Sequence, residues 1–283
     1  MNIRRVGVIG AGTMGNGIAH VFARSGFQVT LCDVEQRFVD RGLENIAANL
    51  EREVAKGKIN ADDKMAALKR ITPAIERAKL ADCNFVVEAA TEKLDIKAVI
   101  FRDLDRICPP DVVFASNTSS ISITKLAALT QRPDKLIGMH FFNPVPVMKL
   151  VEVIRGLATS QETFEIVRDL SLKLEKTPVE VNDAPGFVSN RVLMPLLNEA
   201  MFAVLEDVAT PEAIDEVFKL GMAHPMGPLA LADFIGLDVC LDIMHVLQDG
   251  FGDSKYRPCP LLIKMVDAGW LGKKSGRGFY NYS

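Results

Sequence analysis

The feature that most constrains the fold of this chain is the glycine-rich stretch GAGTMG at residues 10–15. A β-branched run precedes it, a helical stretch follows it, and a second apolar run, FQVTLCD, ends at Asp33. This is the strand, turn, helix, strand order of a βαβ unit. Gly10, Gly12 and Gly15 have GxGxxG spacing, which serves a tight turn, close approach of the backbone to a pyrophosphate, and helix–strand packing.

Asp33 bears on which dinucleotide such a turn would bind. It ends the second predicted strand, where its carboxylate can accept hydrogen bonds from the adenosine ribose hydroxyls. A 2′-phosphate about 4 Å away would cost on the order of 4 kcal/mol per charge pair near a surface. We therefore expect NAD, and expect NADP less, with Arg37 close enough in sequence to weaken the preference. The alternative is a glycine turn that serves packing alone.

The remaining pattern predicts an α/β protein with two domains. Residues 36–70 predict two helices, broken near 57–60, before the sheet resumes. Further strands are expected at 71–75, 85–90, 112–116, 135–141, 148–154 and 177–182, with helices at 93–107 and 160–175. Alternating strands and helices indicate a Rossmann-type, mostly parallel sheet covered on both faces.

Strand signals end near residue 183, where Pro and Gly in NDAPGFVSNR mark a hinge. Helical stretches follow at 188–220, 236–249 and 260–268, with a turn at AHPMGP, residues 223–228. We expect a dinucleotide-binding domain at 1–184 and an all-helical domain at 185–283.

Composition excludes several classes of protein. The net charge of −3 argues against a nucleic-acid partner and against a membrane surface. No apolar run approaches the roughly 18 residues of a spanning helix, and the N-terminus predicts a strand rather than a signal peptide. The five cysteines and four histidines lack disulfide or metal-site spacing, so no metal is expected. We expect a cytoplasmic protein.

The stretch MHFFNPVPVMKLVEVI, residues 139–154, carries one imidazole and one carboxylate in an otherwise apolar run. Burying either group unpaired would cost several kcal/mol. His140 ends a predicted strand, at the edge where parallel sheets bind ligands, and could act as a general base. If the next strand returns alongside, Glu152 can bond the other ring nitrogen and stabilise the imidazolium. The alternative is a core histidine bonded to a backbone carbonyl, beside a solvent-facing glutamate.

Two further polar segments have competing interpretations. SNTSS, residues 116–120, follows a strand, so its hydroxyls and the Asn117 amide lie at the same edge as His140; they could equally cap a helix that starts near residue 122. Asn190 begins the helical domain, where its amide could close a cleft over a substrate or pair with loop backbone.

Several motifs together resemble the L-3-hydroxyacyl-CoA dehydrogenase family. They are GAGTMGNGIA, EAATEKLDIK, SNTSSI, GMHFFNPVPVMKLVEV, DAPGFVSNRVLMPLLNEA, HPMGPLALADFIGLD and GKKSGRGFYNY, and they run along essentially the whole chain. Within that family the chain is most similar to the short bacterial 3-hydroxybutyryl-CoA enzymes. The resemblance implies reversible oxidation of L-3-hydroxyacyl-CoA by NAD, and a homodimer formed by the helical domain, which also contacts substrate.

The resemblance also implies roles for individual residues. His140 matches the catalytic base, Glu152 its carboxylate partner, and Ser119 and Asn190 the residues that hold the substrate. The cofactor-binding residues it implies are Gly10, Gly12, Met14, Gly15, Asp33, Ala90, Glu92, Lys97, Asn117, Asn143 and Lys264. Residues 36–70 match the part that meets coenzyme A, with Lys56 and Arg52 as phosphate ligands; a solvated charged face is the alternative for each.

Two other functions remain as alternatives. A dehydrogenase of small free β-hydroxy acids would share the two-domain plan, but commonly uses a lysine base and has no need of the 36–70 segment. A non-catalytic protein that merely binds dinucleotide, whether structural or a nucleotide-sensing module, would not need an aligned acid–base pair or an intact set of Ser119, His140, Glu152 and Asn190.

Overall fold

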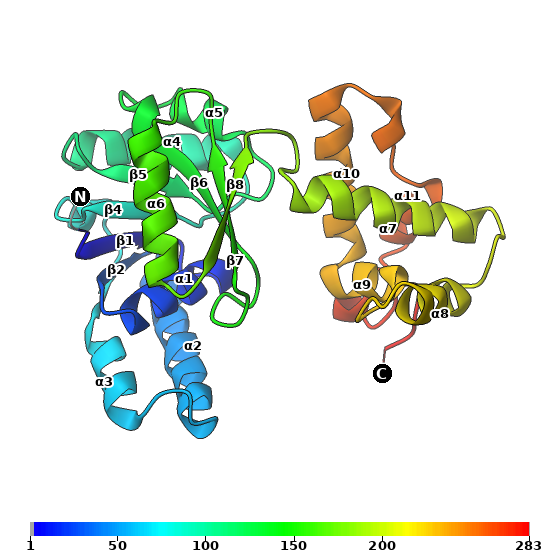
Figure 1. Cartoon of the computed structure of the whole chain (residues 1–283), viewed down its shortest axis with the longest axis horizontal. Coiled ribbons are helices and arrows are strands. Elements are labelled where there is room, and N and C mark those ends of the chain that lie inside the picture. Colours follow the sequence, from blue (N-terminus) through cyan, green and yellow to red (C-terminus); the bar gives the residue numbers. More distant parts are fainter. Residues whose placement is uncertain (1–2, 283) are drawn as a thin grey trace. The chain divides into compact units, whose positions relative to one another are not determined.

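The computed structural model describes residues 3–282, which form two compact units that divide after Asp183 (Figure 1). The first unit is built on an eight-stranded sheet with the order β3-β2-β1-β4-β5-β6-β7-β8. The strands are β1 (Arg5–Ile9), β2 (Gln28–Cys32), β3 (Ile71–Ala74), β4 (Phe85–Glu88), β5 (Val113–Ser116), β6 (Leu136–Phe141), β7 (Leu150–Arg155) and β8 (Thr177–Asn182). Every neighbouring pair is parallel except β6 and β7, so the predicted fold class is confirmed.

Helices cover this sheet and extend from it. They are α1 (Thr13–Arg24), α2 (Gln36–Ala55), α3 (Ala61–Lys69), α4 (Leu94–Ile107), α5 (Ile123–Ala127) and α6 (Gln161–Lys173), with short 3₁₀ turns at Arg77–Leu80 and Pro133–Lys135. Residues of α1 and α6 share one hydrophobic core with the strands, and Figure 1 shows α6 in front of the sheet with α4 and α5 behind it.

The predicted excursion between the second and third strands is confirmed as the α2–α3 pair. Val39, Ile46 and Leu50 are fully buried on one face of α2. Asn60 begins α3 with a capping box, since its side chain accepts from the N–H of Asp63 and the Asp63 carboxylate accepts in return. The two helices are therefore folded parts of the first unit.

The strand order reverses direction between β1 and β4. The chain moves from β1 outward to β2 and β3, then returns to the other side of β1 and continues through β5 to β6. Connections at such a point leave a crevice beyond the carboxyl ends of the strands, which is where open α/β sheets bind ligands. The polar residues that follow β1, β4 and β5 all lie at this edge.

The second unit is helical. Its helices are α7 (Ser189–Leu205), α8 (Pro211–Gly221), α9 (Pro228–Ile235), α10 (Leu237–Phe251) and α11 (Pro260–Asp267). The single helical stretch expected at 188–220 is wrong, because Asp207 adopts a positive φ of 54° and Thr210 caps a new helix whose first residue is Pro211. Helix α9 was not expected, since Gly227 and Pro228 predicted only a turn, yet Pro228 begins a helix.

Two buried aspartates hold the end of the chain against this unit. Asp233 accepts hydrogen bonds from the N–H groups of Phe279 and Tyr280 and from the Tyr282 hydroxyl, each at 3.0 Å. Asp215 accepts from the Tyr280 hydroxyl at 2.8 Å and from two N–H groups at the start of α9. Burial raises the pKa of Asp233, against the effect of these donors.

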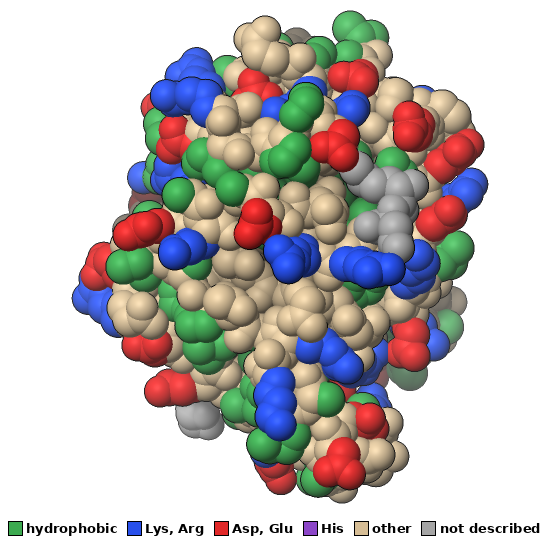
Figure 2. Space-filling model, turned by 90° about the vertical axis from the view of Figure 1, so that its left-hand side faces the viewer, with side chains coloured by type: hydrophobic (Ala, Val, Ile, Leu, Met, Phe, Trp, Pro, Cys, Tyr) green, Lys and Arg blue, Asp and Glu red, His purple; other side chains and the backbone are tan. Residues whose placement is uncertain are grey.

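The surface carries charges of both signs. On the face shown in Figure 2, basic and acidic side chains are interspersed among apolar ones. Among the helices that the structure describes, none is long and apolar enough to cross a membrane.

We expect Asp233→Ala to destabilise the protein by about 2–4 kcal/mol, because it leaves two partly buried N–H groups without an acceptor. Urea unfolding followed by circular dichroism measures this change. Exposed Asp267 at the end of α11 supplies the matched control, for which Asp267→Ala should stay within about 0.5 kcal/mol. Equal stability of the two variants would contradict the account of the C-terminal segment.

Candidate active site

The glycine turn lies between β1 and α1, and its three predicted glycines have distinct environments. Gly10 has a φ of 95°, and a Cβ there would lie 2.4 Å from the Ala89 carbonyl oxygen. A Cβ on Gly15 would lie 1.7 Å from the Gly10 oxygen, so the helix packs directly on the turn. Gly12, the N-cap of α1, would meet nothing within 4 Å. The open position is the one at which a phosphate would approach the helix N-terminus.

Asp33 follows β2 and braces this turn. Its carboxylate accepts the N–H of Ala11 at 2.6 Å and that of Val34 at 2.7 Å. Each carboxylate oxygen has a further lone pair, so these bonds leave acceptor capacity for ribose hydroxyls. Asp33 therefore also shapes the glycine turn, a role that the spacing alone did not indicate.

A cavity of about 890 Å³ lies beside the turn and Asp33. The apolar part of its lining comes from the ends of β1 and β2, the residue after β3, and helices α2 and α4. Among the predicted cofactor-binding residues, Gly10, Gly12, Asp33 and Ala90 line it. The combination of an apolar lining, an open position at Gly12 at a helix N-terminus and an acid after β2 fits the adenosine half of a dinucleotide.

His140 and Glu152 face each other across the one antiparallel pair of the sheet. They are directly opposite in the β6–β7 register, and His140 Nδ1 lies 2.8 Å from Glu152 Oε2. His140 is 8% exposed and Glu152 is 3% exposed. Because a carboxylate only accepts, Nδ1 carries the proton in this bond and Nε2 bears the lone pair of the neutral ring. The geometry is that of a base whose tautomer is set by an acid.

Lys176 holds the β6–β7 turn through hydrogen bonds to its backbone. This lysine is 6% exposed, and its ammonium donates to the carbonyls of Val145 at 2.5 Å and Met148 at 2.7 Å. Burial and the charge of Arg24 lower the pKa of Lys176 to about 8. Sequence reasoning missed this residue, which lies 24 positions after Glu152 and has no motif around it.

Glu92 organises the loop that follows β5. One of its oxygens accepts from the Thr118 hydroxyl, from the N–H of Ser119 at 3.0 Å and from the N–H of Ser120 at 3.2 Å. Burial would raise the pKa of Glu92, but the charge of Lys97 and hydrogen bonds from the side chains of Thr118, Lys97 and Ser120 outweigh it and lower the pKa. The predicted substrate residue Ser119 is thus positioned by a predicted cofactor residue.

Lys97 lies deeper than sequence reasoning suggested. It is 1% exposed, and its Nζ lies 2.7 Å from Glu88 and 3.2 Å from Glu92. Glu88, fully buried at the end of β4, was also missed. The sequence EAATEK offers two acids, and only the fold distinguishes the buried one from the one at the edge.

The other predicted residues lie in several places. Asn117 bridges β5 to β6, since its Oδ1 accepts the N–H of Phe141 at 2.9 Å. Asn143 is exposed in the β6–β7 turn, and Met14 is half-buried in the first turn of α1. Arg52 and Lys56 are exposed, one turn apart, at the end of α2, whereas Asn190 in α7 and Lys264 in α11 belong to the second unit.

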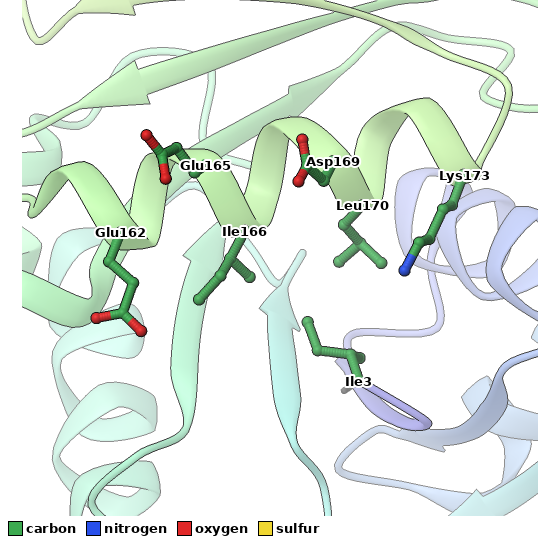
Figure 3. Close-up of a pocket in the computed structure, with 7 residues that line it drawn as sticks. All are labelled: Ile3, Glu162, Glu165, Ile166, Asp169, Leu170 and Lys173. Carbon is green, nitrogen blue, oxygen red and sulfur yellow. The ribbon is translucent and has the colours of Figure 1, made fainter. Parts of the chain in front are cut away.

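A second hollow, of about 260 Å³, lies along α6 and Ile3 (Figure 3). Three carboxylates and one lysine of α6 line it, together with apolar Ile166 and Leu170, and none of them is a predicted site residue. Among residues 3–282, no group of three or more His, Cys, Asp or Glu side chains is placed to hold a metal ion.

Comparison with known proteins agrees with this geometry. The model of the 3-hydroxyacyl-CoA dehydrogenase NAD-binding domain matches residues 5–184, and that of the C-terminal domain of the same family matches 186–282. A Bacillus subtilis protein described as a probable 3-hydroxybutyryl-CoA dehydrogenase is 59% identical over 100% of this chain and 98% of its own length. The 3-hydroxybutyryl-CoA dehydrogenase of Bradyrhizobium diazoefficiens is 54% identical over 99% and 96%.

Solved structures give the same result. The crystal structure of (S)-3-hydroxybutyryl-CoA dehydrogenase from Ralstonia eutropha superposes with a TM-score of 0.98, at 52% identity and full coverage of both chains. The family model also supports NAD as the cofactor of the first unit.

Lys176 generates a prediction about stability and pH. Its pKa is about 8 in the folded protein and about 10.4 in an unfolded chain, so the unfolded state binds the proton more tightly. Stability contributed by this group therefore rises as pH increases from 8 towards 10. Relative to Lys176→Met, the wild-type free energy of unfolding should gain on the order of 1–2 kcal/mol across that range.

Urea unfolding of both proteins at pH 8 and pH 10 measures the gain, with Lys173→Met on the exposed face of α6 as the control. If the wild-type free energy of unfolding, taken relative to that of Lys176→Met, stays constant or falls between pH 8 and pH 10, this amine does not titrate as described.

Proposed function

The chain belongs to the 3-hydroxyacyl-CoA dehydrogenase family, and on this basis we propose that it catalyses the reversible NAD-dependent oxidation of an L-3-hydroxyacyl-CoA to the 3-ketoacyl-CoA. We further propose a short acyl chain, with 3-hydroxybutyryl-CoA as the substrate, because several of the most similar relatives carry that name. The observation that carries the proposal is the His140–Glu152 pair on the same sheet as the glycine turn.

The topology supports a shared crevice for the two. The glycine turn follows β1 and His140 lies at the end of β6, and these strands are joined by parallel pairings through β4 and β5. Both therefore lie at the carboxyl edge of the sheet, three strand spacings apart, or about 14 Å. An extended dinucleotide bound at the turn can span that separation.

His140 is the proposed general base and acid. NAD supplies the hydride acceptor when it is bound. His140 Nε2 accepts the proton of the 3-hydroxyl group during oxidation and returns it to the 3-keto oxygen during reduction. Glu152 holds the proton on Nδ1 and stabilises the imidazolium, which lowers the cost of charging a ring in a mostly buried position.

Other residues complete the proposed site. Ser119 and Asn190 bind the substrate oxygen and the thioester segment. The proposed cofactor-binding residues are those of the glycine turn, Asp33 and Ala90, together with Met14, Gly15, Glu92, Lys97, Asn117, Asn143 and Lys264. Arg52 and Lys56, both cationic and exposed at the end of α2, suit phosphates of coenzyme A.

The two alternative functions have less support. A dehydrogenase of free β-hydroxy acids would leave the folded α2–α3 segment and its exposed cations without a role. A non-catalytic dinucleotide-binding protein would not need a buried acid bonded to a buried histidine, since burying both groups is costly.

We propose that the first unit, residues 1–184, binds NAD and that the second, 185–283, contributes to substrate binding and homodimerisation. Large apolar side chains exposed on α8, the α8–α9 turn and α9 support a partner subunit on the second unit; they include Val217 at 57%, Leu220 at 77%, Met222 at 55% and Phe234 at 63%. A cytoplasmic location stays a prediction.

The activity is tested by mixing the protein with acetoacetyl-CoA and NADH and following the absorbance of the reduced cofactor. We expect turnover by the wild type, and a loss of 10²–10⁴-fold in kcat for His140→Gln, because proton transfer is removed. Calorimetric titration should give unchanged NADH binding by the variant.

Free acetoacetate serves as the control substrate for the rival dehydrogenase class. Near-normal turnover by His140→Gln, or faster reduction of free acetoacetate than of its CoA thioester, would refute the proposal.

The proposed dimer is tested by light scattering coupled to size-exclusion chromatography. The wild type should elute with twice the mass of one chain, and Leu220→Asp should shift it towards a monomer because it places a charge on the apolar surface. Leu157→Asp, at a 90% exposed leucine of the first unit, is the matched control. A wild type that elutes as a monomer would exclude the dimer.

A further inference from the structure

Glu88 is a fully buried acid that the proposed proton transfer does not use. It is 0% exposed at the last position of β4, beside the point where the strand order reverses. One oxygen accepts from the Ala90 N–H and from Lys97 Nζ, each at 2.7 Å, and the other accepts from the Ser116 hydroxyl at 2.6 Å. These three donors come from three different segments at the carboxyl edge of the sheet.

Lys97 extends this arrangement towards the surface. Its Nζ donates to Glu88 and lies 3.2 Å from Glu92, so one buried cation is shared by two carboxylates. Glu88 sits on a central strand and Lys97 on the first turn of α4, both rigid elements. Glu92 sits in the loop between them, and its side chain is 37% exposed. The position of the Glu92 side chain therefore depends on the buried Glu88–Lys97 pair.

Glu92 in turn fixes the loop that carries Ser119. It receives hydrogen bonds from the backbone N–H groups of Ser119 and Ser120 and from the Thr118 hydroxyl. The start of the same loop is tied to β4 and β6, because the N–H of Asn117 donates to the Glu88 carbonyl and its Oδ1 accepts from Phe141, the neighbour of His140. The loop is thus anchored on one side by ion pairs and on the other by the strand of the proposed base.

A purely stabilising role does not explain this choice of residues. A buried ion pair is often no better for stability than well-packed apolar side chains of similar volume. Directional, charge-assisted bonds do provide a fixed geometry, which apolar packing specifies less tightly.

We propose that Glu88 is a positioning residue that acts through Lys97 and Glu92 to hold Ser119 at a fixed distance from His140. This inference rests on the proposed function, since Ser119 is taken to bind the substrate oxygen there. Displacing such a group by about 1 Å can cost on the order of 10²-fold in rate.

Glu88→Gln separates charge from shape. The Gln amide oxygen can accept from Ala90 and Lys97, and the amide nitrogen can donate to the Ser116 hydroxyl, so the three contacts are kept with the direction of the Ser116 bond reversed. One of the two anionic partners of Lys97 is lost, and the cation should shift towards Glu92 and carry the loop with it. Glu180→Gln is the matched control, because it neutralises a half-exposed acid of β8 that pairs with Arg155 at 3.1 Å.

The experiment measures kcat with acetoacetyl-CoA and the dissociation constant for NADH in a double-mutant cycle of Glu88→Gln and Lys97→Met. We expect Glu88→Gln to lower kcat at saturating NADH at least tenfold, and to weaken NADH binding by a smaller factor, because Lys97 and Glu92 also belong to the proposed cofactor set. The control Glu180→Gln should equal wild type. On the Lys97→Met background, Glu88→Gln should cause no further loss, because its route to the loop has already been removed.

The double variant keeps the inference falsifiable if either single variant fails to fold, since it buries no charge at these positions. We expect it to fold and to show a kcat at least tenfold below wild type. A kcat within twofold of wild type for Glu88→Gln or for the double variant would overturn the inference, as would equal losses on both backgrounds. In each of those cases the wild type would still turn over acetoacetyl-CoA, so the proposed function would stand. A wild type without turnover would overturn the proposed function, and this inference with it.

Discussion

The hydrogen bond between His140 and Glu152 is the interaction on which the functional account depends. It exists because β6 and β7 form the one antiparallel pair of the sheet, which places the two residues directly opposite each other. In a parallel pairing, β7 would need a long crossover connection, and the acid would not return beside the imidazole through a short turn. The turn that permits it is held by Lys176, so a buried amine just before β8 supports a pair of residues in two other strands.

Carboxylates also fix loop segments elsewhere along the carboxyl edge of the sheet. Asp33 binds the N–H of Ala11 in the glycine turn, and Glu92 binds the loop after β5, so each acid fixes a segment that is also proposed to meet a ligand. Carboxylates suit this task because their two oxygens accept several bonds in defined directions. The site is therefore organised by acids at strand ends rather than by packing alone.

Much of this was accessible from sequence because the relevant signals are local. The glycine spacing, the acid ending the next strand and the period of the strands predicted the fold class and the place of the crevice. The contacts of Glu88, Lys97 and Lys176 were not accessible, because a buried polar residue carries no signature in the sequence until its partners are known. The long helix expected at 188–220 failed for a related reason: Asp207 and the Thr210–Pro211 cap interrupt an apolar pattern that continues on both sides.

A crystal structure of the protein with NADH and acetoacetyl-CoA tests the central claim most directly. We expect His140 Nε2 within hydrogen-bond reach of the 3-keto oxygen, at about 2.6–3.2 Å, with Glu152 still bonded to Nδ1. A substrate carbonyl beyond the reach of one intervening water, or an imidazole turned away from it, would contradict the assignment of His140 as the base.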